Sequence, residues 1–147
     1  GVASQWAMEA KAGDTLLIGG PRGSLVVPED YAWQLYVCDE TGMPALRRRL
    51  EALQTLAERP QVTALVMVKD DADKAYLAGF DGFNIEWISG YDVATVAARL
   101  AQLTVPESDY FIWLTGEGKV VKSLTDGFVT DAIDPQLVRS SAYWHAK

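Results

Sequence analysis

The segment of residues 35–46 constrains the fold more than any other part of the chain. An apolar run at residues 35–38 leads into a short polar turn that contains Gly42, and Pro44 then opens a helix. Proline is favoured at the first helical position, so this order of residues predicts a strand, a turn and a helix. The free backbone N–H groups of the helix N-terminus would lie at the carboxyl end of the strand, where a pyrophosphate can bind.

The rest of the chain alternates between strand-like and helix-like segments. The continuous apolar run at residues 63–68 is typical of a parallel strand covered on both faces, whereas residues 83–88 alternate more and are expected nearer an edge. Asp92 is suited to cap a helix, and Pro60 and Pro106 are expected to end helices. Strands are predicted at residues 15–19, 35–38, 63–68, 83–88, 110–114 and 142–145, and helices at residues 43–58, after Asp92 and at residues 118–129.

This order of elements predicts an α/β fold. Strands separated by helices form βαβ units with right-handed crossovers, which build a three-layer structure: a parallel sheet with helices on both faces. The ligand crevice of such a sheet lies at the carboxyl ends of its strands. Thr41 and Gly116 each follow a predicted strand closely, so both are expected at the crevice.

Charge and composition narrow the classes of partner. The chain has 147 residues, 49% of them hydrophobic, and a formal net charge of −7. This charge disfavours nucleic acid and anionic membranes, and no apolar run approaches the roughly 20 residues of a membrane span. The single cysteine, Cys38, cannot form an internal disulfide, and the first residues lack the features of a signal peptide. We therefore expect a cytoplasmic protein without membrane or nucleic-acid partners.

Two further groups of residues favour structural interpretations. The arginines at residues 47–49 follow one another on a helix, where successive side chains point about 100° apart, so a solvated outer face is favoured over a phosphate clamp. Cys38 and His145 cannot supply the four ligands of a structural zinc site, and no serine or cysteine arrangement around His145 indicates a hydrolytic triad. No metal site is predicted.

Three more blocks accompany the strand–turn–helix segment, at residues 20–28, 109–117 and 142–144. Taken in order, the four blocks resemble the siderophore-interacting protein family, the flavin-dependent ferric-siderophore reductases, and the resemblance covers nearly the whole chain. It implies a ferredoxin-reductase-like NAD(P)-binding module at residues 31–147. Residues 1–30 would then be a flavin-contacting helix and a connection from an N-terminal FAD-binding barrel, whose Arg-x-Tyr-Ser/Thr motif this sequence lacks.

The resemblance also implies an activity. NADPH would bind to this chain and pass a hydride to FAD, and the reduced flavin would give single electrons to a ferric siderophore, which then releases ferrous iron. No side chain of this part need act as an acid or a base, because the redox chemistry belongs to the cofactors. The alternative is a non-catalytic module that binds a nucleotide or a siderophore. The expected partners are the siderophore and the chain's own flavin barrel.

The resemblance places cofactor contacts in four segments. The two acids of the first turn would repel phosphates if they faced them, so Thr41 and backbone N–H groups are the better contacts there. The residues at which the resemblance places contacts are Asp39, Glu40, Thr41, Gly42 and Pro44 for the pyrophosphate, Thr115, Gly116 and Glu117 for the nicotinamide, Val2, Ala3 and Ser4 for the flavin pyrophosphate, and Trp144 beside the flavin.

Four cations are candidates for anionic groups. Lys69 follows the strand at residues 63–68 and is positioned to meet a 2′-phosphate of the adenosine, although three nearby aspartates disfavour a phosphate; Lys119 is a second candidate. For both lysines, a solvated side chain is the favoured interpretation. The resemblance assigns Arg22 and Arg139 to an anionic ferric siderophore, for which charge-assisted hydrogen bonds are suited. Their structural alternative is a pair of surface arginines in loops.

Overall fold

A five-stranded parallel sheet lies at the centre of the computed structural model, which describes residues 2–20 and 26–146. The strand order is β3-β2-β1-β4-β5, and every neighbouring pair is parallel. The strands are β1 (Trp33–Cys38), β2 (Gln61–Val68), β3 (Asn84–Ser89), β4 (Tyr110–Glu117) and β5 (Val138–Trp144); the helices are α1 (Val2–Glu9), α2 (Met43–Gln54), α3 (Val93–Leu100) and α4 (Gly118–Phe128), with short 3₁₀ turns η1 (Asp71–Leu77) and η2 (Pro135–Leu137).

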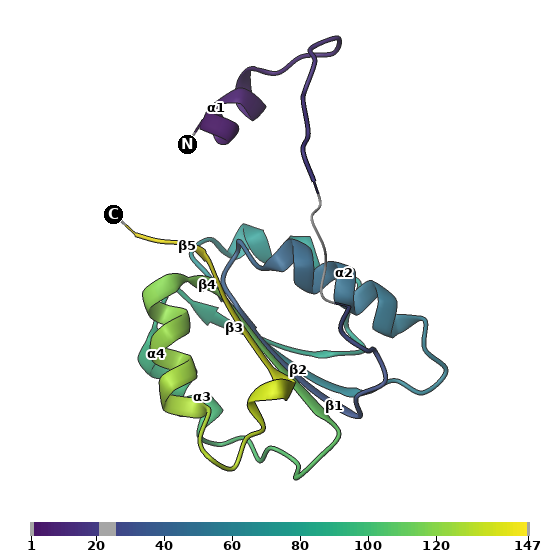
Figure 1. Cartoon of the computed structure of the whole chain (residues 1–147), viewed down its shortest axis with the longest axis vertical. Helices are drawn as coiled ribbons and strands as arrows, with labels where there is room; N and C mark the ends of the chain where they lie inside the picture. Colours follow the sequence, from purple (N-terminus) through teal and green to yellow (C-terminus); the bar gives the residue numbers. More distant parts are fainter. Residues whose placement is uncertain (1, 21–25, 147) are drawn as a thin grey trace.

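Helices cover both faces of the sheet (Figure 1). On one face, Leu46, Leu50 and Leu53 of α2 are buried against alternate residues of β1 and β2. On the other face, α3 and α4 bury their apolar stripes against the remaining residues of the same strands. Alternate side chains of a strand point to opposite faces, so strands buried on both faces must be apolar throughout, as β1 and β2 nearly are. The predicted three-layer α/β fold is confirmed.

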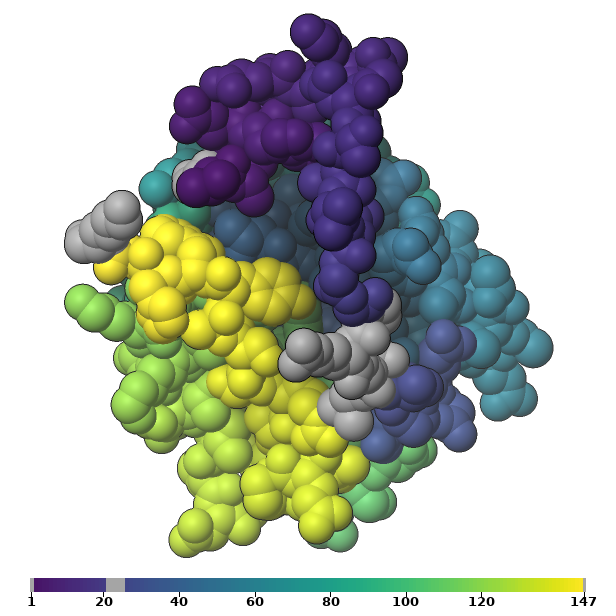
Figure 2. All heavy atoms as spheres, turned by 45° about the horizontal axis from the view of Figure 1, so that its top comes forward, coloured from purple at the N-terminus to yellow at the C-terminus, as the bar shows by residue number. Residues whose placement is uncertain are grey.

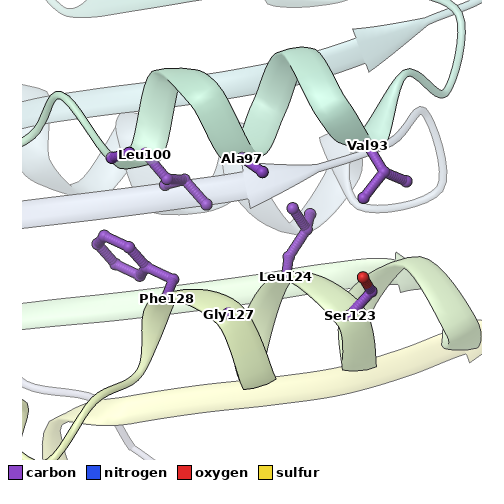
Figure 3. A pocket seen from close by; sticks show the side chains of 8 residues that line it. Val93, Ala97, Leu100, Ser123, Leu124, Gly127 and Phe128 are labelled. Carbon is purple, nitrogen blue, oxygen red and sulfur yellow. The ribbon is translucent and has the colours of Figure 1, made fainter.

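α3 and α4 lie side by side on their face of the sheet (Figure 3). A pocket of about 110 Å³ lies between them, and Ala97, Leu124 and Gly127 are among the residues that line it. Asp92 caps α3 as predicted, because its carboxylate accepts hydrogen bonds from the N–H groups of Ala94 and Thr95. α4 begins directly after the carboxyl end of β4.

Several predicted boundaries are wrong, and one of them is the end of α3, which lies at Leu100 and not at Pro106. Residues 15–19 form no strand: they are extended without a neighbouring strand to bond, and Leu17 is 94% exposed. α2 ends at Gln54, not at Glu58, because the chain turns at Thr55, whose N–H donates to two carbonyls of the last turn. β5 begins at Val138, well before the predicted residue 142, because it pairs with β4 from Ile112 onward. The prediction that β3 lies at an edge is confirmed.

Arg49 departs from the expectation that residues 47–49 form a solvated face. Its guanidinium donates to the Tyr36 hydroxyl at 2.9 Å, to the Val27 carbonyl at 3.0 Å and to Oε1 of Gln34 at 3.1 Å. It therefore ties α2 to β1 and to the connection that precedes β1. Arg48, its neighbour, is exposed as expected.

The N-terminal segment stands apart from the sheet. α1 buries none of its residues, and after a turn at residues 11–14 the chain runs on without helix or strand to residue 20 (Figure 1). In the space-filling view, which brings the top of Figure 1 forward, this segment lies in front of the body of the molecule (Figure 2). Across the described residues, no helix is both long and apolar enough to cross a lipid bilayer.

Candidate functional site at the carboxyl edge of the sheet

The parallel strands bring most of the predicted cofactor residues to one edge. Cys38 at the end of β1 is in register with Val66 of β2 and Thr115 of β4, so the turns that follow these strands are neighbours. The predicted residues that lie at this carboxyl edge are Asp39, Glu40, Thr41, Gly42, Pro44, Lys69, Thr115, Gly116, Glu117, Lys119 and Trp144. By contrast, Val2, Ala3 and Ser4 are exposed on α1, apart from this edge.

Asp39 lies at the centre of the carboxyl edge and is only 1% exposed. Its Oδ1 accepts hydrogen bonds from the N–H and the hydroxyl of Thr41, at 2.9 Å and 2.5 Å. Its Oδ2 accepts hydrogen bonds from the N–H of Glu117 at 3.0 Å and from the indole N–H of Trp144 at 2.8 Å. The carboxylate therefore joins the ends of β1, β4 and β5 and does not face solvent.

Two glycines allow this close packing. Gly116 has a φ of +141°, and a Cβ there would lie 2.5 Å from Oδ2 of Asp39. A Cβ at Gly42 would lie 2.6 Å from both Cβ of Cys38 and Cγ2 of Thr115. Real Cβ atoms do not approach other atoms so closely, so both positions need glycine for packing within the protein.

The start of α2 offers few free backbone donors. The N–H groups of Thr41, Gly42 and Met43 donate to Oδ1 of Asp39, the carbonyl of Asp39 and the carbonyl of Glu40, and Pro44 has no N–H. Within residues 41–45, all of them described, this leaves the N–H of Ala45. Thr41, Pro44 and Ala45 are exposed, so this surface is open to a ligand.

Glu40 turns toward the ends of β2 and β3. Its carboxylate accepts hydrogen bonds from the N–H of Lys69 at 3.0 Å and from the hydroxyl of Tyr91 at 2.6 Å. Burial and the Glu40 carboxylate raise the pKa of Tyr91 well above its ordinary value of 10. The ammonium of Lys69 lies 4.4 Å from the centre of the Tyr91 ring, a cation–π contact.

Tyr91 is a residue that the sequence reasoning did not find. Its ring lies between the Lys69 ammonium and the Trp144 indole, whose ring centre is 6.0 Å away. The available signal was its position, because it follows β3 by two residues and so falls at the same strand ends as the other candidates. An aromatic residue in a polar turn is expected to bury its ring against such neighbours.

Glu117 caps α4. Its carboxylate accepts hydrogen bonds from the N–H groups of Lys119 and Val120 at the helix start and from the N–H of Ala146. These bonds, led by those from Val120 and Ala146, lower the pKa of Glu117 below its usual value of 4.5. Lys119 is exposed beside this cap.

Of the two predicted siderophore-binding arginines, Arg139 is the one that the structure describes, and it lies away from this edge. The final strand was expected to begin at residue 142, which would place Arg139 ahead of it. β5 begins at Val138, so Arg139 belongs to the strand. It pairs with Trp113, which packs on the α2 side, and donates hydrogen bonds to the carbonyls of Gln136 and Val138. Arg22 lies outside the described residues.

Aromatic side chains line a groove on the α2 side of the sheet. The groove measures about 300 Å³ and lies where α2 leaves β4 and β5 uncovered. Trp113 packs edge-on against both Tyr36 and Tyr143. Arg49 lies at the groove, but its guanidinium is bonded to the protein itself.

The sequence of this chain is similar to those of known proteins. The sequence profile of the siderophore-interacting protein family matches residues 31–147, and that of the siderophore-interacting FAD-binding domain matches residues 1–25. The NADPH-dependent ferric-chelate reductase of Escherichia coli K12 is 66% identical over 147 residues, which are 100% of this chain and 58% of that protein. This chain therefore spans somewhat more than half the length of that relative.

Solved structures show the same fold. A siderophore-interacting protein from Aeromonas hydrophila superposes with a TM-score of 0.75 at 22% identity, over 99% of this chain and 63% of that one. The flavohaem-like FAD/NAD-binding domain of nitric oxide dioxygenase from Vibrio cholerae superposes with a TM-score of 0.60 at 16% identity, over 86% and 56% of the two chains. This confirms the ferredoxin-reductase-like fold. With its profile match over residues 31–147 and a relative that is 66% identical, the chain belongs to the siderophore-interacting protein family.

Proposed function

We propose that this chain is the NADPH-binding part of a reductase that uses FAD to reduce ferric siderophores or other ferric chelates and so releases ferrous iron. The observation that carries the proposal is the carboxyl edge, where the helix-opening turn at residues 39–44 meets the Gly116 turn of β4. The relative that is 66% identical is named as an NADPH-dependent ferric-chelate reductase, which supports the same activity here.

The side chains at the carboxyl edge suit a dinucleotide with two phosphates. Asp39 and Glu40 are held inward by N–H and O–H donors, so neither carboxylate needs to face a phosphate. The surface that remains open at the start of α2 carries Thr41 and the N–H of Ala45, where the helix dipole favours negative charge. Lys69 and Lys119 add positive charge on either side of this turn and remain the candidates for the 2′-phosphate.

This chain would contribute binding and orientation. Thr41 and the start of α2 would hold the pyrophosphate, and the ends of β4 and β5, with Gly116 and Trp144, would border the nicotinamide and the flavin. Bound NADPH and FAD supply the hydride and single-electron chemistry. A side chain of this part is not required to move a proton.

The chain's own flavin barrel is the proposed partner domain, with residues 1–30 as the connection to it. α1, which would bring Val2, Ala3 and Ser4 to the flavin pyrophosphate, buries none of its residues here. Leu17 and Ile18 are 94% and 79% exposed, and the aromatic groove beside β5 is uncovered. These apolar surfaces support a further domain that covers them. The single cysteine supports a cytoplasmic location.

Arg22 and Arg139 are the proposed contacts for an anionic siderophore. A chain with a net charge of −7 needs local cations to hold such a ligand. In the chain joined to its flavin barrel, Arg139→Ala should raise the apparent Michaelis constant for a ferric catecholate at least tenfold, since a charge-assisted hydrogen bond contributes about 1.5–3 kcal/mol. Arg48→Ala, an exposed arginine on α2, is the control. Slower flavin reduction by NADPH with unchanged siderophore reduction would refute the assignment.

The activity is tested by the two half-reactions of the chain joined to its flavin barrel. Thr41→Trp should obstruct the open surface at α2 and weaken NADPH binding at least tenfold, or about 1.4 kcal/mol. Thr104→Trp, at an exposed position beyond α3, should bind NADPH normally. Stopped-flow spectroscopy should then show slower flavin reduction only in the first variant, with unchanged oxidation of pre-reduced flavin by a ferric siderophore. A flavin spectrum that NADPH does not bleach would favour the non-catalytic binding module.

A further inference from the structure

The buried carboxylate of Asp39 serves two surfaces of the proposed nucleotide site. Through Oδ1 it fixes Thr41 by both the N–H and the hydroxyl, and Thr41 lies on the open surface at the start of α2. Through Oδ2 it fixes the indole of Trp144, the C-terminal aromatic residue, together with the N–H of Glu117. One side chain thus connects the turn after β1 with the ends of β4 and β5.

The chemistry of these contacts requires an acid. All four partners are donors, and a buried carboxylate offers an acceptor to each of them. An amide at position 39 would present an NH₂ group to at least one of these donors, so at least one bond would be lost. Hydrogen bonds to a charged acceptor are also roughly twice as strong as those between neutral groups. Position 116 requires glycine, because a Cβ there would displace the Asp39 carboxylate.

Trp144 in turn spans the carboxyl edge. It ends β5, one outer strand of the sheet, and its ring packs at 6.0 Å against Tyr91, which follows β3, the other outer strand. Tyr91 is itself held by Glu40 through its hydroxyl. The indole is therefore held by two contacts, the hydrogen bond to Asp39 and the packing against Tyr91.

We propose that Asp39 is a positioning residue of the nucleotide site: it does not touch the nucleotide, and it acts by holding the Thr41 turn and the Trp144 indole in the arrangement that binds NADP(H). The proposal rests on the proposed function, because it takes the carboxyl edge as the nucleotide site. It changes the role expected for Asp39, from a direct cofactor contact to a residue that acts through its neighbours.

The test compares Asp39→Asn with the unmodified 147-residue chain. The five tryptophans give separate indole N–H signals in a ¹H–¹⁵N spectrum, and Trp144→Phe identifies the signal of Trp144. In Asp39→Asn this signal should shift and its N–H should exchange with solvent faster. Calorimetric titration with NADP⁺ should give a dissociation constant raised at least tenfold. Asp92→Ala, which removes the cap of α3, is the control for lost stability and should change neither measurement.

Each result decides a separate point. An unchanged Trp144 signal in Asp39→Asn would overturn the proposal, and so would an unchanged NADP⁺ affinity. A loss of affinity as large in Asp92→Ala as in Asp39→Asn, at equal thermal stability, would also overturn it, since the effect would then be one of general stability. If the unmodified chain bound no NADP⁺ while the Trp144 signal still responded to Asp39→Asn, the proposed function would fail but the bond between the two side chains would stand.

Discussion

At the scale of single residues, the carboxyl edge is organised by interactions within the protein. Asp39 and Glu117, both among the residues at which the resemblance places cofactor contacts, accept hydrogen bonds from neighbouring strands and helices. Gly42 and Gly116, at which the resemblance places cofactor contacts, allow the close approach of Cys38, Thr115 and Asp39 within the protein. Residue type and position could be predicted from the sequence, but the partner of each group depends on strand register, which no local pattern reveals.

Gly116→Ala should destabilise the fold. Its Cβ would overlap the Asp39 carboxylate, and a φ of +141° is strained for alanine. Overpacking of this kind costs about 1–3 kcal/mol, which urea unfolding can measure. Gly127→Ala in α4 is the matched control, because a Cβ there meets nothing within 4 Å and alanine favours a helix by about 0.5–1 kcal/mol. Equal stability of Gly116→Ala and the unmodified chain would contradict the close contact.

Glu117 should make stability depend on acid pH. Its pKa is lowered in the folded chain, so between the folded and unfolded pKa values the unfolded state binds more protons. The stabilisation is present above the usual value of 4.5 and is lost as pH falls through the folded pKa. Thermal unfolding should therefore show a smaller acid-side loss in Glu117→Gln than in the unmodified chain. Identical acid profiles of the two would show that the carboxylate is not held as described.

At the scale of elements, hydrophobic periodicity predicted the strands and helices of the sheet core. The run at 63–68 and the stripe of α2 were identifiable because burial on one or two faces imposes a period. Residues 15–19 had the composition of a strand but have no strand beside them, and pairing is a tertiary property. The inward direction of the Arg49 side chain could not be predicted for a similar reason, because its hydrogen-bond partners lie more than ten residues away in the sequence.

Arg49→Ala should loosen the connection between α2 and β1. The variant would leave the buried Gln34 side chain and the Tyr36 hydroxyl without their charged partner. Loss of hydrogen bonds to a charged group costs about 1.5–3 kcal/mol, measurable by chemical denaturation. Arg48→Ala, one residue earlier and exposed, should change stability by no more than about 0.5 kcal/mol. Similar stabilities of the two variants would rule out this role for Arg49.

At the scale of the whole molecule, residues 31–146 form the layered core, and residues 2–20 contribute no buried side chain to it. The expected boundary at residue 30 and the expected flavin barrel both came from the family resemblance. Neither follows from periodicity or spacing, because these patterns describe only the residues in which they occur. The position of the nucleotide edge, in contrast, follows from the parallel sheet alone.

The 147-residue chain should not retain FAD by itself. Val2, Ala3 and Ser4 are exposed on a helix that buries nothing, so they cannot hold a flavin without further contacts. Gel filtration after incubation with FAD should yield a colourless protein. A stoichiometric yellow flavin spectrum in the protein peak would refute this, provided that the chain elutes as a monomer.

The central claim, that the carboxyl edge binds the nicotinamide nucleotide, is tested most directly by mapping NADP⁺ onto the chain. In ¹H–¹⁵N spectra, titration should perturb the amides of Thr41, Ala45 and Gly116 and the indole of Trp144. Amides at the opposite edge, such as Ala32 and Asp109, should stay unchanged. Saturable shifts confined to the carboxyl edge would support the account; shifts at the opposite edge, or none at millimolar NADP⁺, would contradict it.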